Sequence, residues 1–154
     1  MDHHTGGGKR MNVREVTQAI IRATEVRPFP AGRTCDVLIT GDPDMPVRRV
    51  GVLPGGGSLG LGVEQMPMQL MARRNLDVLL CGDLTEWTLP AYVRDASQMG
   101  MNRAIIVLGH ERSEEPGMKF LGDWLSFLLP DLPVVFLDAG EPFCYFHKVI
   151  EKED

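Results

Sequence analysis

Short, continuous apolar runs alternate along this chain with longer segments that have the periodicity of helices. The runs VRRVGVL (47–53), LDVLLCG (76–82) and NRAIIVLG (102–109) each have about the length of one strand. Uninterrupted apolar runs of this kind are typical of strands that are covered on both faces. The stretch that ends at Arg74 and the segment TEWTLPAYVRDASQMG (85–100) are predicted to be mainly helical. Strands that alternate with helices indicate an α/β domain, a layered domain whose largely parallel or mixed sheet is flanked by helices.

Further elements are expected before this alternation. A helix that begins at Asn12 is predicted to end before Pro28, because proline cannot continue a helix. The apolar face of this helix consists of Val13, Val16, Ile20 and Ala23. CDVLIT (35–40) is predicted to be a strand.

The segment after GHERSEEP has the clearest helical pattern. We predict that Ser113 is its N-cap and that Pro116 lies in its first turn, where proline is tolerated. The apolar positions that share one face of this helix are Met118, Leu121, Leu125 and Leu128. Strands are predicted at 133–140 and at 141–150.

Length and charge narrow the class of protein. A chain of 154 residues with 44% hydrophobic content can bury one core, so we expect one domain over 12–150 after a polar, flexible tail at 1–11. The formal net charge of -5 argues against general affinity for nucleic acid or an anionic membrane. No apolar stretch approaches the roughly 20 residues of a membrane span, and we expect a cytoplasmic protein. Its three cysteines, Cys35, Cys81 and Cys144, are expected to be buried free thiols of a reducing compartment.

The glycine run after the strand at 47–53 is the first candidate site. Gly55, Gly57 and Gly60 satisfy the pattern G-x-G-x-x-G, and Gly55, Gly56 and Gly57 are the residues that could bind a nucleotide cofactor. Two other interpretations stay open. The run could be a turn shaped by backbone geometry, or it could contact another anion or substrate.

Carboxylates follow the next predicted strand and form the second candidate site. Asp83 and Glu86 in CGDLTEW could ligate a metal or act as a base. The alternative interpretation is a loop acid and a helix-start acid that face water.

The third candidate site follows the strand at 102–109. A turn into the next helix could bring the imidazole of His110 and the carboxylate of Glu114 to a shared point. Zn²⁺, Mn²⁺ and Fe²⁺ accept this pair of ligands, although further ligands would have to come from elsewhere in the chain. Alternatively, His110 is a loop histidine and the acids stabilise a helix N-terminus.

The residues of all three candidate sites also carry a family resemblance. GHERSEEPGMKFLGDWL resembles the carboxyl-terminal signature of the Nif-three-like proteins, a family described as dinuclear metal centre, hexamer-forming proteins and as type-two GTP cyclohydrolase homologues. PVRRVGVLPGGGSLG, LDVLLCGDLTEWTLPAYVRDA and LPVVFLDAGEPF resemble further segments of that family in the same order, so that the resemblance covers 47–143.

The resemblance implies that His110 and Glu114 are metal ligands and that Asp83 or Glu86 borders the site. It also implies a homo-oligomer. Full-length members have an earlier α/β half with a paired-histidine motif, and this chain resembles the second half alone. Asp2, His3 and His4 resemble the remnant of a segment between the halves.

Three functions are consistent with these patterns. The leading hypothesis is a divalent-metal-binding domain, a hydrolase of a nucleotide or another phosphate ester in which Glu86 or Asp83 is the base. The second is a non-catalytic assembly or interaction module with an incomplete metal site. The third is a nucleotide-binding α/β domain that uses the glycine turn.

Overall fold

A computed structural model describes residues 10–23, 37–60 and 62–138 of the chain. Its strands are β1 (Leu38–Thr40), β2 (Val50–Leu53), β3 (Val78–Cys81) and β4 (Ala104–Val107). Its α-helices are α1 (Val13–Ala23), α2 (Met66–Arg74), α3 (Leu89–Gln98) and α4 (His110–Leu128), and η1 (Gly55–Leu59) is a short 3-10 helix. The order of these elements confirms the predicted alternation of strands and helices.

The four strands form one sheet in the order β1-β4-β3-β2. The strands β2, β3 and β4 are parallel, whereas β1 pairs with β4 in the antiparallel sense. The prediction of a largely parallel or mixed sheet is therefore confirmed. Because the parallel strands are in register, Leu53, Cys81 and Val107 end them at the same edge of the sheet.

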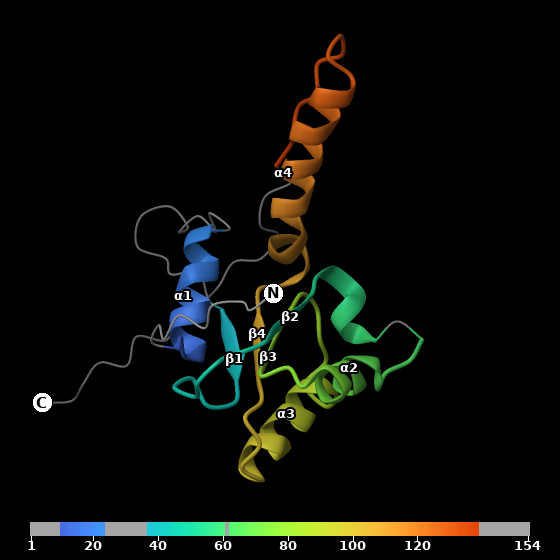
Figure 1. The fold of residues 1–154 in the computed structure, drawn as a ribbon. Coiled ribbons are helices and arrows are strands. Elements are labelled where there is room, and N and C mark those ends of the chain that lie inside the picture. Colours follow the sequence, from blue (N-terminus) through green and yellow to red (C-terminus); the bar gives the residue numbers. More distant parts are fainter. Residues whose placement is uncertain (1–9, 24–36, 61, 139–154) are drawn as a thin grey trace, which may run out of the picture. The chain divides into compact units, whose positions relative to one another are not determined.

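Helices cover both faces of the sheet (Figure 1). On one face, Leu79 and Ile105 pack with Met71 of α2 and Val93 of α3, all of which are fully buried. On the other face, alternate residues of the same strands pack against α1; the cluster there includes Val13, Val78, Ala104 and Ile106. The alternation explains the continuous apolar runs, since both sides of each central strand are buried.

The helix α1 begins where the sequence predicts. Asn12 Oδ1 accepts a hydrogen bond from Glu15 N (2.8 Å), and Glu15 Oε2 accepts one from Asn12 N (3.0 Å). This reciprocal capping satisfies two backbone donors that a helix start leaves without partners. Val13 is buried at the start of the predicted apolar face.

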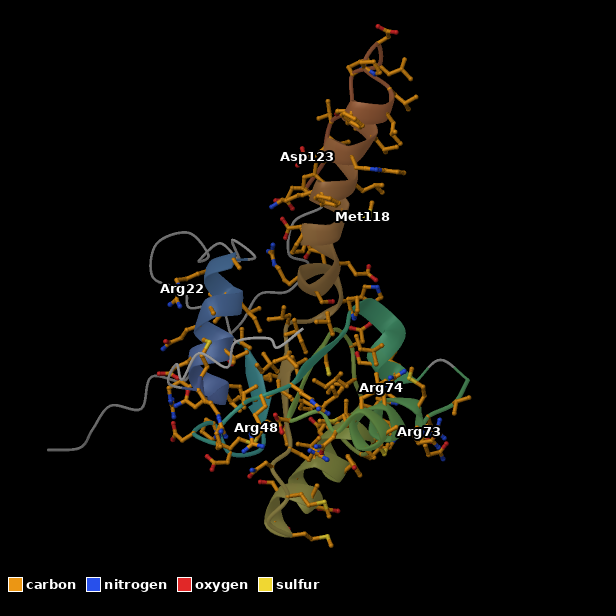
Figure 2. All side chains as sticks on the ribbon, viewed as in Figure 1. Arg22, Arg48, Arg73, Arg74, Met118 and Asp123 are labelled. Atoms are coloured by element: carbon orange, nitrogen blue, oxygen red, sulfur yellow. The ribbon has the colours of Figure 1, made fainter. Side chains whose placement is uncertain are left out.

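The chain divides into two compact units, and the boundary between Gly117 and Met118 lies within α4. In the second unit, the side chains of α4, such as Met118 and Asp123, are visible in Figure 2. Lys119 Nζ lies 5.4 Å from the centre of the Phe136 ring. The expectation of a single domain over 12–150 stays a prediction.

The structure differs from two of the sequence predictions for this second unit. Residues 133–138 are not a strand, because no described residue pairs with their backbone, and Leu137 is 83% exposed. The strand predicted at 141–150 lies outside the described residues. The predicted apolar face of α4 is present in sequence, but Met118 and Leu128 on it are exposed.

Cys81 is a free thiol buried in the core, as predicted, and burial raises its pKa to about 12. The other two cysteines lie outside the described residues. Within the described residues, no helix is long and apolar enough to cross a membrane.

Candidate metal centre

Three segments meet at the carboxyl edge of the sheet, where the parallel strands end. Gly55 follows β2, Asp83 follows β3 and His110 follows β4. One residue from each of the three candidate sites thus lies at the same edge of the sheet. This placement agrees with the general location of sites in open α/β sheets.

His110 lies between two carboxylates. Its Nδ1 is 2.5 Å from Asp83 Oδ2, and its Nε2 is 3.4 Å from Glu114 Oε2, one helical turn further along α4. About half of each of these three side chains is exposed to solvent. The hydrogen bond to Asp83 is the largest cause of a raised pKa at His110; desolvation opposes it, and the negative charges of Asp83 and Glu114 add smaller upward effects.

The contact with Asp83 also selects the tautomer of the neutral imidazole. A carboxylate accepts the Nδ1 proton, which leaves the lone pair of Nε2 directed at the side of the ring where Glu114 lies. Carboxylates orient metal-binding histidines in the same way.

Glycines bring the backbone of two loops close to these side chains. The φ angle of Gly55 is 54°, and a Cβ added there would overlap Glu114 Oε1 and lie 3.2 Å from His110 Nε2. A Cβ added at Gly82 would overlap the backbone N and O of Gly55. Gly82 therefore needs glycine, because backbone atoms occupy the volume of any larger side chain, whereas a side chain at position 55 would displace the carboxylate of Glu114.

Two serine hydroxyls tie the three segments together. Ser113 Oγ on α4 accepts a hydrogen bond from Gly55 N (2.9 Å) and donates one to His110 O (2.7 Å). Ser58 Oγ donates to the carbonyl oxygen of Asp83, and Asp83 N donates to Gly55 O (2.9 Å). Sequence reasoning missed these roles, since Gly55 and Ser113 are far apart in the chain and no short motif joins them.

The start of α4 corrects two sequence predictions. The helix begins at His110, and the carbonyl of Gly109 accepts a hydrogen bond from Ser113 N at 3.2 Å. Ser113 is therefore inside the first turn and not the N-cap, because Gly109, with a φ of 89°, provides the turn before the helix. Pro116 accordingly lies in the helix interior, beyond the first turn.

The structure does not bring every predicted site residue together. Glu86 lies exposed in the turn before α3, and no hydrogen bond or ion pair joins it to His110, Asp83 or Glu114. Its role as a base stays a prediction.

The glycine turn is shaped mainly by hydrogen bonds within the chain. The amides of Gly55, Gly57 and Gly60 donate to Ser113 Oγ, Pro54 O and Gly57 O, respectively. Three amides of the pattern are thus engaged in protein hydrogen bonds and are not directed at a phosphate. The helix α2 begins at Met66 and does not follow the glycines directly. Nucleotide binding by this turn, including Gly56, stays a prediction with no support from this geometry.

The donor atoms fit part of a divalent metal site. Two ligands about 2.0–2.1 Å from one tetrahedral Zn²⁺ lie about 3.3 Å apart, and Nε2 of His110 lies 3.4 Å from Oε2 of Glu114. In the part of the chain that the structure describes, no group of three or more His, Cys, Asp or Glu side chains could hold a metal ion. The donors Asp2, His3 and His4 lie outside that part.

Comparisons with known proteins agree with the fold. Residues 9–142 match the family Duf34/NIF3 (NGG1p interacting factor 3). Over 96 residues the chain is 32% identical to a protein of Pasteurella multocida (strain Pm70) named GTP cyclohydrolase 1 type 2 homolog. The aligned residues make up 62% of this chain and 33% of that protein.

Two solved structures have the same fold as this chain. A Bacillus cereus protein related to NIF3 superposes with a TM-score of 0.62 at 19% identity, covering 90% of this chain and 33% of the other. A Staphylococcus aureus hypothetical protein superposes with a TM-score of 0.55 at 17% identity, covering 90% of this chain and 35% of the other. The chain thus spans about a third of the length of these relatives. Since the family match extends over most of its residues, the chain belongs to the Duf34/NIF3 family.

Proposed function

We propose that this domain binds a divalent metal ion through His110 and Glu114. The observation that carries the proposal is the geometry around the imidazole. Nδ1 lies 2.5 Å from Asp83 Oδ2, and Nε2 lies 3.4 Å from Glu114 Oε2, the separation expected of two ligands to one ion. Zn²⁺, Mn²⁺ and Fe²⁺ all accept a nitrogen and an oxygen ligand of this kind.

The surrounding residues have separate roles in this proposal. Asp83 orients the imidazole, Ser113 holds the backbone of Gly55 against α4, and the missing side chain of Gly55 leaves room for Glu114. A bound metal would supply Lewis-acid polarisation of a phosphoryl or carbonyl oxygen. We therefore propose a metal-dependent hydrolase that acts on a nucleotide or another phosphate ester. The name of the Pasteurella multocida relative, a GTP cyclohydrolase homolog, supports a nucleotide substrate.

The test is metal content per chain after purification under metal-replete conditions. We expect bound metal in the unaltered protein and a loss of most of it in His110→Ala and in Glu114→Gln. Glu86→Gln is the matched control, because it removes an equal charge from an exposed carboxylate that contacts neither ligand. Equal metal content in all four proteins would contradict the assignment of the ligands.

Turnover needs its own measurement. Metal-loaded protein would be incubated with GTP and with a panel of phosphate esters, and products would be followed by chromatography. If Glu86 is the base, Glu86→Gln retains metal and loses turnover, whereas His110→Ala loses both.

A non-catalytic module is the second candidate function. It is favoured by the incomplete ligand set of the described residues. Such a module would bind metal weakly, form a homo-oligomer and leave every substrate unchanged. Light scattering with and without metal, beside the turnover assay, distinguishes it from the hydrolase.

A further inference from the structure

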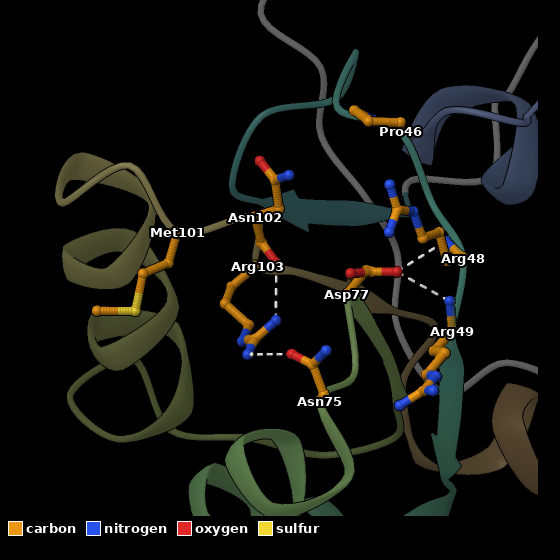
Figure 3. A pocket seen from close by; sticks show the side chains of 8 residues that line it. All are labelled: Pro46, Arg48, Arg49, Asn75, Asp77, Met101, Asn102 and Arg103. Carbon is orange, nitrogen blue, oxygen red and sulfur yellow. Dashed lines mark hydrogen bonds between the residues drawn. The ribbon is translucent and has the colours of Figure 1, made fainter.

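Figure 3 shows a basic pocket. It lies at the edge of the sheet opposite to His110, which follows the end of β4. Its volume is about 400 Å³, and its polar lining consists of Arg48, Arg49, Asn75, Asp77, Asn102 and Arg103. These residues come just before β2, β3 and β4. Because the three strands are parallel, the residues before them meet at the amino edge of the sheet.

In the part of the chain that the structure describes, the three guanidinium groups of this pocket have no carboxylate partner. Among the described residues, no Asp or Glu oxygen lies within 4.0 Å of a side-chain nitrogen of Arg48, Arg49 or Arg103. Within the described residues, the side chain of Arg48 makes no hydrogen bond, and that of Arg49 makes one, from Nη1 to the carbonyl oxygen of Arg74 (3.3 Å). Most of the donors of these two groups are therefore available to a ligand.

Arg103 is held in place more firmly than the other two. Its Nη2 donates to Asn75 Oδ1 (3.1 Å) and its Nη1 to the carbonyl oxygen of Asn102 (3.0 Å). Its Nε is buried without a hydrogen-bond partner among the described residues. A buried donor without an acceptor is costly.

Asp77 is the one acidic residue that lines the pocket, and its carboxylate accepts hydrogen bonds from backbone amides. Its Oδ2 accepts hydrogen bonds from the amides of Arg48 (2.7 Å) and Arg49 (2.9 Å). It lies between Arg103 and the Arg48–Arg49 pair, as expected from its place before the central strand β3 (Figure 3). Three arginines against one carboxylate leave a formal charge of two positive units.

We propose that this pocket binds the phosphate group of a small phosphorylated molecule. A phosphate monoester carries a charge close to -2 at neutral pH, which matches the excess positive charge, and guanidinium groups pair well with its oxygens. The volume is in the range of small-molecule sites and exceeds the needs of a bare phosphate ion. The half-exposed Met101 supplies an apolar wall for the remainder of the molecule.

The test is a calorimetric titration of metal-free protein with inorganic phosphate, adenosine monophosphate and adenosine. We expect saturable binding of the monophosphate and of phosphate, and none of adenosine. Arg48→Gln should weaken binding about tenfold or more, the effect of losing one charge-assisted hydrogen bond. Its side chain has no partner in the described structure, so the variant should fold as the unaltered protein does.

Three further variants make the result specific. Arg22→Gln is the matched control: it removes the same charge from an exposed arginine of α1 (Figure 2) and should leave affinity within about twofold. Asp77→Asn should tighten binding, because it removes the negative charge of the pocket. His110→Ala should change nothing, which separates this site from the proposed metal centre. Absence of saturable binding, an equal effect of Arg22→Gln and Arg48→Gln, or loss of binding in His110→Ala would overturn the proposal.

Discussion

Replacing Gly55 by alanine tests the candidate metal centre through the backbone beside it. The residue has a φ of 54°, a conformation that costs an L-amino acid about 1–2 kcal/mol. The added Cβ would overlap Glu114 Oε1 and approach His110 Nε2 to 3.2 Å. Because the Glu114 side chain is 48% exposed, it can turn into solvent at little further cost. We therefore expect a modest loss of stability, about 1–2 kcal/mol, together with loss of most bound metal.

Two other glycines provide the comparison. Gly100 has a φ of 78° and no atom within 4 Å of an added Cβ, so Gly100→Ala should show the conformational cost alone and retain metal. A Cβ at Gly82 would overlap backbone atoms of Gly55, which cannot rotate away. Gly82→Ala should therefore cost about 1–3 kcal/mol from overpacking, at the upper end of that range.

The assays are chemical unfolding for stability and mass spectrometry for metal per chain. Metal content in Gly55→Ala equal to that of the unaltered protein would refute the placement of Glu114 among the ligands. A loss of stability as large as that of Gly82→Ala would refute the freedom of Glu114 to turn away.

Three further predictions concern single groups. In metal-free protein, Asp83→Asn should lower the pKa of His110 in an NMR titration. Because the pKa of His110 is raised in the folded state, its pair with Asp83 stabilises the protein below the unfolded pKa. This stabilisation is lost as the pH rises through the folded pKa. An unchanged pKa would contradict the hydrogen bond. With the other two cysteines replaced by serine, Cys81 should resist a thiol reagent at pH 8 until the protein unfolds, because burial raises its pKa to about 12. Asn12→Ala should lower the free energy of unfolding by about 0.5–2 kcal/mol, and no change would contradict its role as the helix cap.

The architecture could be predicted because the central strands are buried on both faces. Their apolar runs identify them, and the parallel arrangement brings the residues that follow them to one edge. Asp83 and His110 were found by this rule, and their contact confirms that the two segments meet. The same rule, applied to the residues before the strands, would have found Arg48 and Arg103, but charged residues before a strand are more often solvated.

Other features depended on contacts that a sequence does not display. Ser113 has the residue type and the flanking acids of an N-cap, yet Gly109 provides the start of the helix, and the serine hydroxyl binds a distant amide. The apolar run at 133–138 has the composition of a strand but lacks a described strand beside it. A strand is specified by its partner as much as by its own residues.

The two proposed sites lie at opposite edges of the same sheet, and this arrangement makes a quantitative prediction about their coupling. The strands between them are four residues long, which corresponds to about 13 Å at 3.3 Å per residue. The Debye length at physiological ionic strength is about 8 Å, so the attraction between a bound metal ion and a bound phosphate is largely screened.

We therefore expect metal to change phosphate affinity by less than about twofold, and phosphate to change metal affinity by the same factor, because coupling between two sites is reciprocal. Calorimetric titrations of each ligand in the presence of the other measure both factors. A much larger factor that persists at high salt would show that the strands transmit a structural change, since screening would remove a purely electrostatic effect. A large factor that disappears in His110→Ala would mean that phosphate binds at the metal, and the pocket around Arg48 would then be a solvated surface.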